Sequence, residues 1–260
     1  GAAAVLAVND LADYAVFRDA LEGKKRVTVL GGGLIGCEFA NDLGHAGFTV
    51  DVVHLGAWPL ERVLPVEAGR RLADSLAALG VTWHFGRTGS SVGPAAAGYR
   101  VTLDNGDTLA ADVVLSAIGL RPRTQLAQAA GIPVGRGIQT SRLLETGAPN
   151  VYALGDCAEV EGQNLPYVQP LMVQARALAA TLTGTPTPVV YPAMPVMVKT
   201  PAHPVAVLPP RLGASGGWKV ECGDTGICAL HVDDNGRLQG FALTGSETGR
   251  RNTLVKELAA

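Results

Sequence analysis

The sequence has no Cys-x-x-Cys pair and no excess of basic residues, and each absence excludes a class of function. Its four cysteines lie at positions 37, 157, 222 and 228, which excludes a zinc ribbon and a thioredoxin-type redox disulfide. Cys222 and Cys228 give only a weak pairing signal, so free thiols in a reducing cytoplasm are expected. Lys and Arg total 21 against 23 Asp and Glu, so nucleic acid is not an expected partner.

Long hydrophobic runs are also missing, since none reaches the roughly 18 residues that a spanning helix needs. The five histidines lie at positions 45, 54, 84, 203 and 231 and show no metal-ligand spacing. Ser116 lacks the G-x-S-x-G context of a hydrolase nucleophile. The chain does not begin with Met, and its apolar start has no basic segment, so the sequence predicts a piece of a longer protein rather than a signal peptide.

Glycine and apolar residues are abundant, and their order predicts an α/β fold. Glycine supplies 33 of 260 residues and falls mainly at turns. A helix capped by Asn9 or Asp10 is expected to end near Gly23. Apolar strands then alternate with helices, which is typical of a doubly wound parallel sheet; the strands are predicted at 27–30, 48–53, 81–85 and 112–117, and the helices at 34–46 and 65–79.

The second half of the chain has a different pattern. A hairpin is predicted around residues 104–107, within the sheet region, and a short helix after Thr124. A short strand at 151–154, a helix at 170–182 and a Thr- and Pro-rich linker at 183–195 follow. The remaining residues predict an antiparallel sheet, with strands at 196–198, 205–207, 218–220, 227–232 and 237–243, and a closing helix at 246–258.

A glycine motif follows the first predicted strand of this sheet. Gly31, Gly33 and Gly36 fit G-x-G-x-x-G, and Leu34 and Ile35 separate the last two glycines. The first glycine makes the tight turn, the second lets backbone N–H groups approach a pyrophosphate, and the third allows close packing of helix and strand. The alternative is a tight strand-to-helix turn without a ligand, but the strand–glycine–helix context favours a dinucleotide site.

The choice between NADH and NADPH is left open by the sequence. An acidic residue about 20 positions after the motif would bind the adenosine ribose, but His54 ends the next strand instead. Glu61 is a more distant carboxylate that could reach the ribose from the loop. Arg62 is the nearest arginine, and the lack of one directly after His54 slightly favours NADH.

Three motifs in order give the sequence a family resemblance: Gly-Gly-Gly-Leu-Ile-Gly-Cys-Glu-Phe-Ala at 31–40, Ser-Ala-Ile-Gly-Leu-Arg-Pro at 116–122 and Val-Tyr-Ala-Leu-Gly-Asp-Cys-Ala at 151–158. The chain resembles the pyridine-nucleotide, FAD-dependent oxidoreductases. It looks most like the NADH:rubredoxin reductases, also over residues 195–202. The resemblance implies hydride transfer from NADH to FAD, then single electrons to a small redox protein such as rubredoxin. A ferredoxin reductase, an NADH oxidase and a non-catalytic nucleotide-binding fragment are the alternatives.

The resemblance also implies roles for particular residues. Asp156 would bind the ribityl chain of FAD, although it could instead be a turn residue that caps the next helix. Glu38 would lie near the nicotinamide, and Gly119 would bring backbone close to the NAD. Lys199 would place a cation beside the flavin ring. Solvent-exposed surface positions are the alternative for Glu38 and Lys199.

Three domains are expected from this resemblance: an NAD(P)-binding Rossmann-type domain at 1–120, the C-terminal part of an FAD domain at 121–188, and a small α+β domain at 189–260. The family has an earlier glycine motif for the FAD pyrophosphate, and none precedes Gly31 here. The sequence therefore predicts a chain that lacks the N-terminal FAD segment and is catalytically impaired when alone. Its expected location is the cytoplasm.

Overall fold

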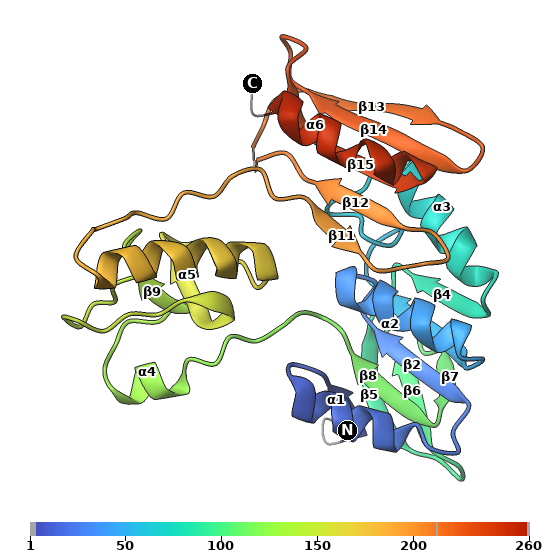
Figure 1. The fold of residues 1–260 in the computed structure, drawn as a ribbon. Helices are drawn as coiled ribbons and strands as arrows, with labels where there is room; N and C mark the ends of the chain where they lie inside the picture. Colours follow the sequence, from blue (N-terminus) through green and yellow to red (C-terminus); the bar gives the residue numbers. More distant parts are fainter. Residues whose placement is uncertain (1–3, 212, 259–260) are drawn as a thin grey trace. The chain divides into compact units, whose positions relative to one another are not determined.

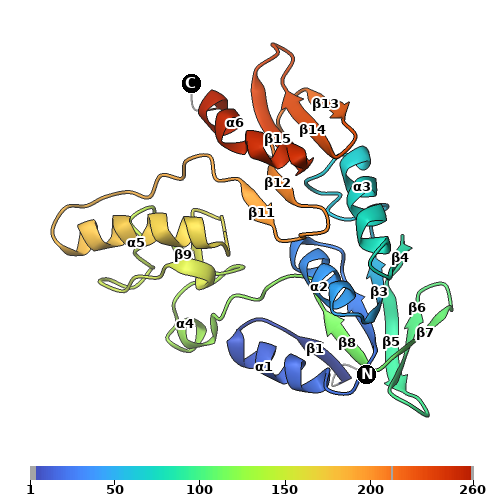
Figure 2. The same ribbon diagram turned by 45° about the vertical axis from the view of Figure 1, so that its right-hand side comes forward.

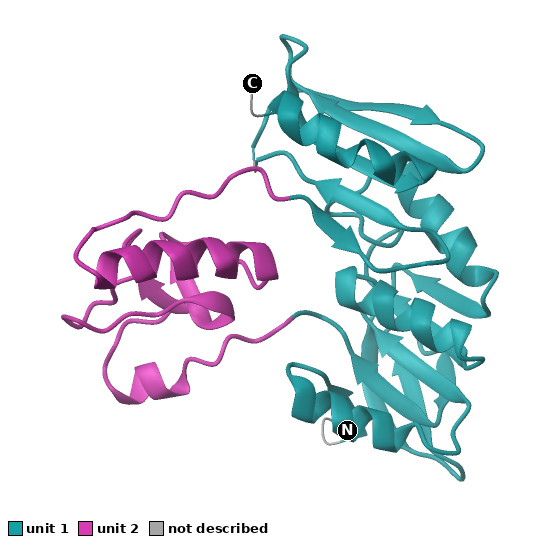
Figure 3. Cartoon of the chain, viewed as in Figure 1, with its two compact units in different colours: residues 1–119, 195–260 teal, residues 120–194 magenta. Residues whose placement is uncertain are grey.

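The structure is a computed structural model that describes residues 4–211 and 213–258. The chain forms two compact units, residues 1–119 with 195–260, and residues 120–194 (Figure 3). The second unit is thus inserted into the sequence of the first. Each unit is described below by itself.

A five-stranded parallel sheet forms the first part of unit 1. In spatial order its strands are β1 (Val5–Ala7), β8 (Val113–Ser116), β2 (Arg26–Leu30), β3 (Thr49–His54) and β4 (Val81–Phe85). Every neighbouring pair is parallel. The helices are α1 (Leu11–Ala20), α2 (Leu34–His45) and α3 (Val66–Ala77). The predicted α/β class with a parallel sheet is confirmed.

Strand β1 was missed by the sequence analysis, which predicted no strand before residue 27. Val5 and Leu6 pair with Val114 and Leu115 of β8, so Val5–Ala7 forms one edge of the sheet. The predicted cap of α1 is confirmed, because the Asp10 carboxylate accepts the N–H of Asp13 at 2.8 Å. The three apolar residues of β1 show no alternation that would distinguish a strand from other short apolar segments.

Two antiparallel sheets complete unit 1. The predicted hairpin is confirmed as β6 (Tyr99–Leu103) and β7 (Thr108–Ala111), and β5 (Gly89–Pro94) adds a third strand that the sequence analysis missed. The C-terminal sheet has the order β11 (Val196–Val198), β12 (Val205–Leu208), β15 (Leu238–Gly245), β14 (Gly226–Val232) and β13 (Gly217–Cys222). The predicted closing helix is shorter than expected, because a 3-10 turn at Ser246–Arg250 precedes α6 (Arg251–Leu258).

One hydrophobic cluster joins the parallel sheet to the C-terminal sheet. It includes Val29 and Leu115 of the first and Val205 and Ala229 of the second, all completely buried. Helix α2 lies between the parallel sheet and β11 in both views (Figures 1 and 2). The two sheets are therefore parts of one folded body, with a shared core.

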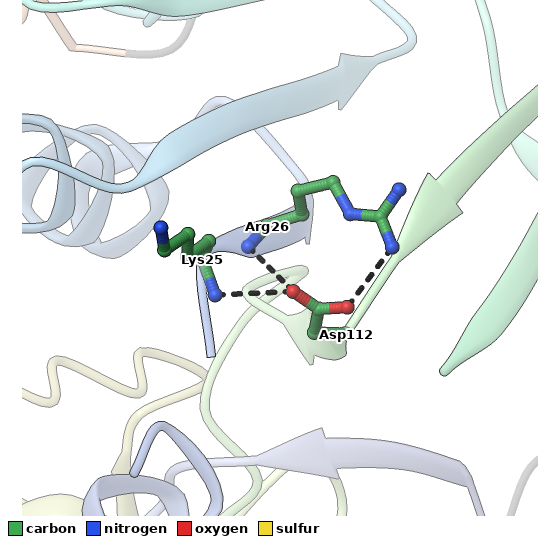
Figure 4. A network of polar contacts seen from close by, with 3 residues as sticks. All are labelled: Lys25, Arg26 and Asp112. Atoms are coloured by element: carbon green, nitrogen blue, oxygen red, sulfur yellow. Dashed lines mark hydrogen bonds and ion pairs between the residues drawn. The ribbon is translucent and has the colours of Figure 1, made fainter. Parts of the chain in front are cut away.

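At the amino-terminal edge of the parallel sheet, Asp112 links the start of β8 to the start of β2 (Figure 4). Its Oδ2 accepts the backbone N–H groups of Lys25 and Arg26 at 3.0 and 2.9 Å, and its Oδ1 pairs with the Arg26 guanidinium at 3.1 Å. These bonds, led by that of the Lys25 N–H, lower the pKa of Asp112 to about 2. The network stabilises the sheet at the end opposite the glycine motif.

Unit 2 contains α4 (Gln125–Ala129), β9 (Ile138–Thr140), β10 (Ala158–Val160) and α5 (Val168–Leu182). Strands β9 and β10 form a short parallel pair that the sequence analysis missed. The strand predicted at 151–154 is wrong, because Tyr152 makes only an isolated bridge to Glu145. The apolar residues of this segment are explained by packing instead, since Tyr152 and Leu154 contact the small core of the unit.

Candidate functional site

The glycine turn lies at the carboxyl end of β2, where parallel α/β sheets bind ligands. Gly31 has φ +110°, and a Cβ there would lie 2.7 Å from the carbonyl oxygen of Ala117. A Cβ on Gly36 would collide with the carbonyl oxygen of Gly31. The first and third glycines of the motif are therefore required by the turn itself, whether or not a ligand is bound.

Gly33 differs from these two glycines, because the space beside it is open. Apart from its two neighbours in the chain, no heavy atom of the described residues lies within 4 Å of the position that a Cβ would take, and the Gly33 backbone is extended at φ −80°. It is the N-cap of α2 and offers no side chain to the N–H groups of Leu34, Ile35 and Gly36. Such N–H groups have no acceptor within a helix. The turn thus presents unpaired donors and the positive end of a helix dipole to open space, which suits a pyrophosphate.

His54 ends β3 next to this turn. Its Nδ1 accepts the backbone N–H of Gly32 at 3.1 Å, so the neutral ring carries its proton on Nε2. Burial lowers the pKa of His54, and the negative charge of Glu61 opposes this effect. Nε2 is buried and makes no hydrogen bond within the described chain. The ring is therefore engaged with the turn through one nitrogen.

Gly119 follows β8 on the same edge of the sheet. Its φ is +125°, and a side chain there would meet open space. The preceding residue, Ile118, is 74% exposed although it is apolar. The structure thus brings Gly119 to the edge that holds the glycine turn, since β8 and β2 are neighbours. An exposed apolar side chain beside an open backbone position is suited to a flat ligand.

Glu38 and Lys199 come together although they are far apart in the sequence. Glu38 lies in the second turn of α2, and its Oε1 accepts the backbone N–H of Lys199 at 2.9 Å. Lys199 is exposed and directly follows β11. This bond links the helix of the dinucleotide site to the C-terminal sheet, and it leaves the Lys199 ammonium outside the contact.

Asn41, one turn beyond Glu38, makes a second bond to the same loop and was missed by the sequence analysis. Its side chain is 3% exposed, and its Oδ1 accepts the N–H of Ala202 at 3.1 Å. Buried amides are usually hydrogen-bonded, and here the partner is distant in the chain. A polar residue on the otherwise apolar side of α2 was the only available signal.

In unit 2, Asp156 lies in a 3-10 turn, Gly155–Cys157, and is exposed. The turn begins at Gly155, whose φ is +77° and whose N–H donates to the Oε1 of Gln174. Gln174 is 2% exposed and donates in turn to the hydroxyl of Tyr191 at 2.7 Å. A buried network therefore fixes the backbone at Asp156, while its carboxylate faces solvent.

Metal and disulfide chemistry find no support in the described residues. No group of three or more His, Cys, Asp or Glu side chains within 4–211 and 213–258 is placed to hold a metal ion. All four cysteines are free thiols, and burial raises the pKa of Cys37 far above its ordinary value. No helix in the same residues has the length and apolar character that a membrane crossing requires.

Comparison with known proteins agrees with this arrangement. Residues 2–179 match the family model of the pyridine nucleotide-disulphide oxidoreductases, and residues 188–258 match the rubredoxin binding C-terminal domain. A rubredoxin-NAD(+) reductase of Alcanivorax borkumensis is 52% identical over 98% of this chain and 67% of its own length. A second, from Acinetobacter baylyi, is 49% identical over 96% of this chain and 65% of its own length.

A solved ferredoxin reductase from Rhodopseudomonas palustris is similar in structure, with a TM-score of 0.84 and 27% sequence identity. The match covers 97% of this chain and 65% of the length of the ferredoxin reductase. The chain thus spans about two thirds of the length of these relatives. The predicted resemblance, with its emphasis on rubredoxin reductases, is confirmed, and so is the predicted oxidoreductase class. The chain belongs to the pyridine nucleotide-disulphide oxidoreductase family.

Proposed function

We propose that this chain carries the NADH-binding and rubredoxin-binding parts of a flavin-dependent reductase. The observation that carries the proposal is the open space at Gly33, at the N-terminus of α2. A turn that needed glycine only for its own geometry would have no reason for an open second glycine, since Gly31 and Gly36 already satisfy the close contacts. The open position therefore supports a ligand that approaches the backbone closely.

The residues of this chain bind and orient the dinucleotide. The N–H groups of Leu34, Ile35 and Gly36 hold the pyrophosphate, and His54 supports the turn by accepting the Gly32 N–H. Gly119 lets the backbone after β8 approach the nicotinamide half of the dinucleotide. NADH is the proposed donor, and NADPH remains the competing dinucleotide.

Bound FAD would supply the hydride acceptance and the one-electron transfer, so this chain would need no acid, base or nucleophile of its own for that chemistry. The exposed Asp156 carboxylate suits the ribityl hydroxyls, because it is an acceptor held on a fixed turn. Lys199 provides a positive charge that would favour an anionic flavin ring. Glu38 positions Lys199 through its backbone and adds a carboxylate for the nicotinamide amide.

The C-terminal sheet is the proposed binding part for rubredoxin, in line with its family match. The relatives that are rubredoxin reductases favour this acceptor over a ferredoxin or oxygen. The four free thiols suit the reducing cytoplasm, which is the proposed location. Since NADH yields two electrons and rubredoxin accepts one at a time, each NADH serves two rubredoxin molecules.

The test is a pair of titrations of the 260-residue chain. Calorimetry with NADH is expected to show one site, and surface plasmon resonance with rubredoxin is expected to show saturable binding that salt or excess free rubredoxin abolishes. A plant-type ferredoxin is the matched control and is expected to bind more weakly. Absence of NADH binding by a folded chain would refute the dinucleotide site, and equal binding of ferredoxin would refute the choice of acceptor.

A further inference from the structure

The loop between β11 and β12, residues 199–204, is attached to helix α2 at two points. The Oε1 of Glu38 accepts the backbone N–H of Lys199 at 2.9 Å, and the Oδ1 of Asn41 accepts that of Ala202 at 3.1 Å. Helix residues with this separation lie on the same face, and the two loop residues have the same separation. Two neighbouring side chains of α2 therefore hold one short segment of the C-terminal sheet.

Hydrogen bonds within the loop join the two points of attachment. Thr200 is completely buried, and its Oγ1 donates to the carbonyl oxygen of His203 at 2.7 Å. The N–H of His203 donates in return to the carbonyl oxygen of Thr200 at 2.8 Å. Pro201 lies inside this turn, where its ring fixes its own φ angle. Since the turn is braced in this way, an anchor at Ala202 also limits the positions that Lys199 can take.

The two anchors differ in how accessible they are. The bond between Glu38 and Lys199 is exposed to solvent, and the same carboxylate is the one proposed for the nicotinamide amide. Asn41 is 3% exposed and lies one turn further from the N-terminus of α2. A ligand at the glycine turn therefore meets Glu38 but not Asn41, and the bond of Asn41 to Ala202 is kept while Glu38 engages the ligand.

Packing alone does not explain an asparagine at this position. The other buried residues of α2 are small or apolar: Gly36, Cys37, Ala40, Leu43 and Gly44. Burying an amide costs free energy unless its polar atoms are hydrogen-bonded, and an apolar residue would avoid that cost. The Nδ2 of Asn41 donates to the neighbouring Asp42, so its Oδ1 is free to serve the loop. The bond to Ala202 is the contribution that an apolar residue could not make.

We propose that Asn41 is a positioning residue, which fixes the place from which the Lys199 side chain extends while Glu38 engages the nicotinamide. This inference rests on the proposed function, because that function gives Lys199 and Glu38 their roles. Without Asn41 the loop would be attached to α2 through Glu38 alone, and a single hydrogen bond allows rotation about itself. The Lys199 charge would then be spread over several positions.

Four variants test this role. Asn41→Leu removes the acceptor with little change in size, and Asn41→Ala removes it without a branched side chain. Asn41→Asp keeps an oxygen for the Ala202 N–H and is the conservative variant. Asn252→Leu is the matched control, because it makes the same substitution at an exposed asparagine of α6 whose Oδ1 accepts from Arg251.

A fifth variant changes the loop instead of the helix. Thr200→Val keeps the shape of the side chain and removes the hydroxyl that bonds the His203 carbonyl. The bond of Asn41 to Ala202 is left in place, but its effect on Lys199 is expected to be weakened. This variant decides the same point if a change at the buried Asn41 prevents folding.

The measurement is the rate of hydrogen exchange at the Lys199 N–H in the 260-residue chain, by NMR with isotope-labelled lysine. The chain has five lysines, and Lys199→Arg identifies the signal. The rate is expected to rise about tenfold in Asn41→Leu and Asn41→Ala, which corresponds to one hydrogen bond of about 1.4 kcal/mol. It is expected to rise in the same direction in Thr200→Val. Asn41→Asp and Asn252→Leu are expected to leave it within about twofold of the wild type.

Lys219 distinguishes a positioning role from a general effect on stability. It lies in β13 of the same C-terminal sheet, away from the loop in the strand order, and its exchange rate is expected to be unchanged. Equal acceleration at Lys199 and Lys219, without rescue by Asn41→Asp, would overturn the inference in favour of a structural role. An unchanged Lys199 rate in the folded variants would also overturn it, because the strand ends alone would then hold the loop.

Calorimetry with NADH on the same samples separates this inference from the proposed function. The affinity is expected to stay within about twofold in every folded variant, because the N–H groups of the glycine turn are unchanged. If wild-type protein binds NADH and the Lys199 rate does not respond to Asn41, the inference is overturned while the proposed function stands. If folded wild-type protein does not bind NADH, the proposed function fails, and the role of Asn41 in the reaction fails with it.

Discussion

Replacing Gly33 by valine separates the binding role of the glycine turn from its structural role. Beyond the adjacent residues of the chain, no heavy atom of residues 4–211 and 213–258 lies within 4 Å of a Cβ at this position, and φ −80° suits any residue. The expected loss of stability is small, about 1 kcal/mol for a poorer N-cap. The side chain would, however, occupy the space through which a pyrophosphate reaches the N–H groups of Leu34 and Ile35.

The effect on binding is much larger than the effect on stability. A hydrogen bond to a charged group contributes about 1.5–3 kcal/mol. Losing the bonds of Leu34 and Ile35 therefore weakens NADH binding by at least about 3 kcal/mol, or more than 100-fold. Calorimetry measures the affinity, and thermal unfolding monitored by circular dichroism measures the stability.

Gly93→Val is the matched control for this experiment. Gly93 also has open space beside it, but it lies in β5 of the three-stranded antiparallel sheet, where a β-branched residue is favourable. The NADH affinity of the Gly93→Val variant is expected to equal that of the wild type. If a folded Gly33→Val variant also bound NADH with unchanged affinity, the pyrophosphate would lie elsewhere and the assignment of the glycine turn would be wrong.

Three further predictions concern other residues. Asp112→Asn is expected to destabilise unit 1 by about 1 kcal/mol at pH 7, a value reduced because water screens the pair. The folded pKa of Asp112, about 2, lies below the ordinary 3.8, so this stability is present above pH 3.8 and is lost as the pH falls toward 2. Urea unfolding of wild type and variant is expected to show a smaller difference in the free energy of unfolding at pH 2.5 than at pH 7. An equal difference at both pH values would show that the network is unimportant. His54→Glu is expected to raise the preference for NADH over NADPH, because the 2′-phosphate would meet a like charge; equal dissociation-constant ratios in variant and wild type would show that position 54 does not face the ribose. Asp156→Ala is expected to weaken FAD binding about tenfold without changing NADH affinity, measured by flavin fluorescence in protein that binds FAD, and unchanged FAD affinity would refute the ribityl assignment.

Local sequence was sufficient to predict the glycine turn. The strand, the three glycines and the helix are adjacent in the chain, so their geometry depends on short-range contacts such as that of Gly36 with Gly31. The hairpin was predicted for the same reason, because Asn105-Gly106 determines its turn and Gly106 has φ +91°. Much of unit 1 could be predicted in this way.

Features that depend on distant partners could not be predicted. Strands β1, β9 and β10 have three residues each and exist because another strand lies beside them. The bonds of Glu38 to Lys199 and of Asn41 to Ala202 join residues that no spacing rule connects. The strand predicted at 151–154 was wrong for a related reason. Burial in a small core and pairing in a sheet give similar short apolar patterns in the sequence.

The discontinuous sequence of unit 1 has a consequence for how the chain folds during synthesis. Residues 1–119 leave the ribosome before residues 195–260, but part of their core is covered by Val198, Val205 and Ile227, which are made later. Until then, apolar surface of the early segment stays exposed and vulnerable to aggregation. Closing the unit around a long insertion adds little thermodynamic cost, because loop-closure entropy grows only slowly with length. The delay is therefore kinetic, and we expect chaperone dependence to be greatest between the synthesis of residues 120 and 245.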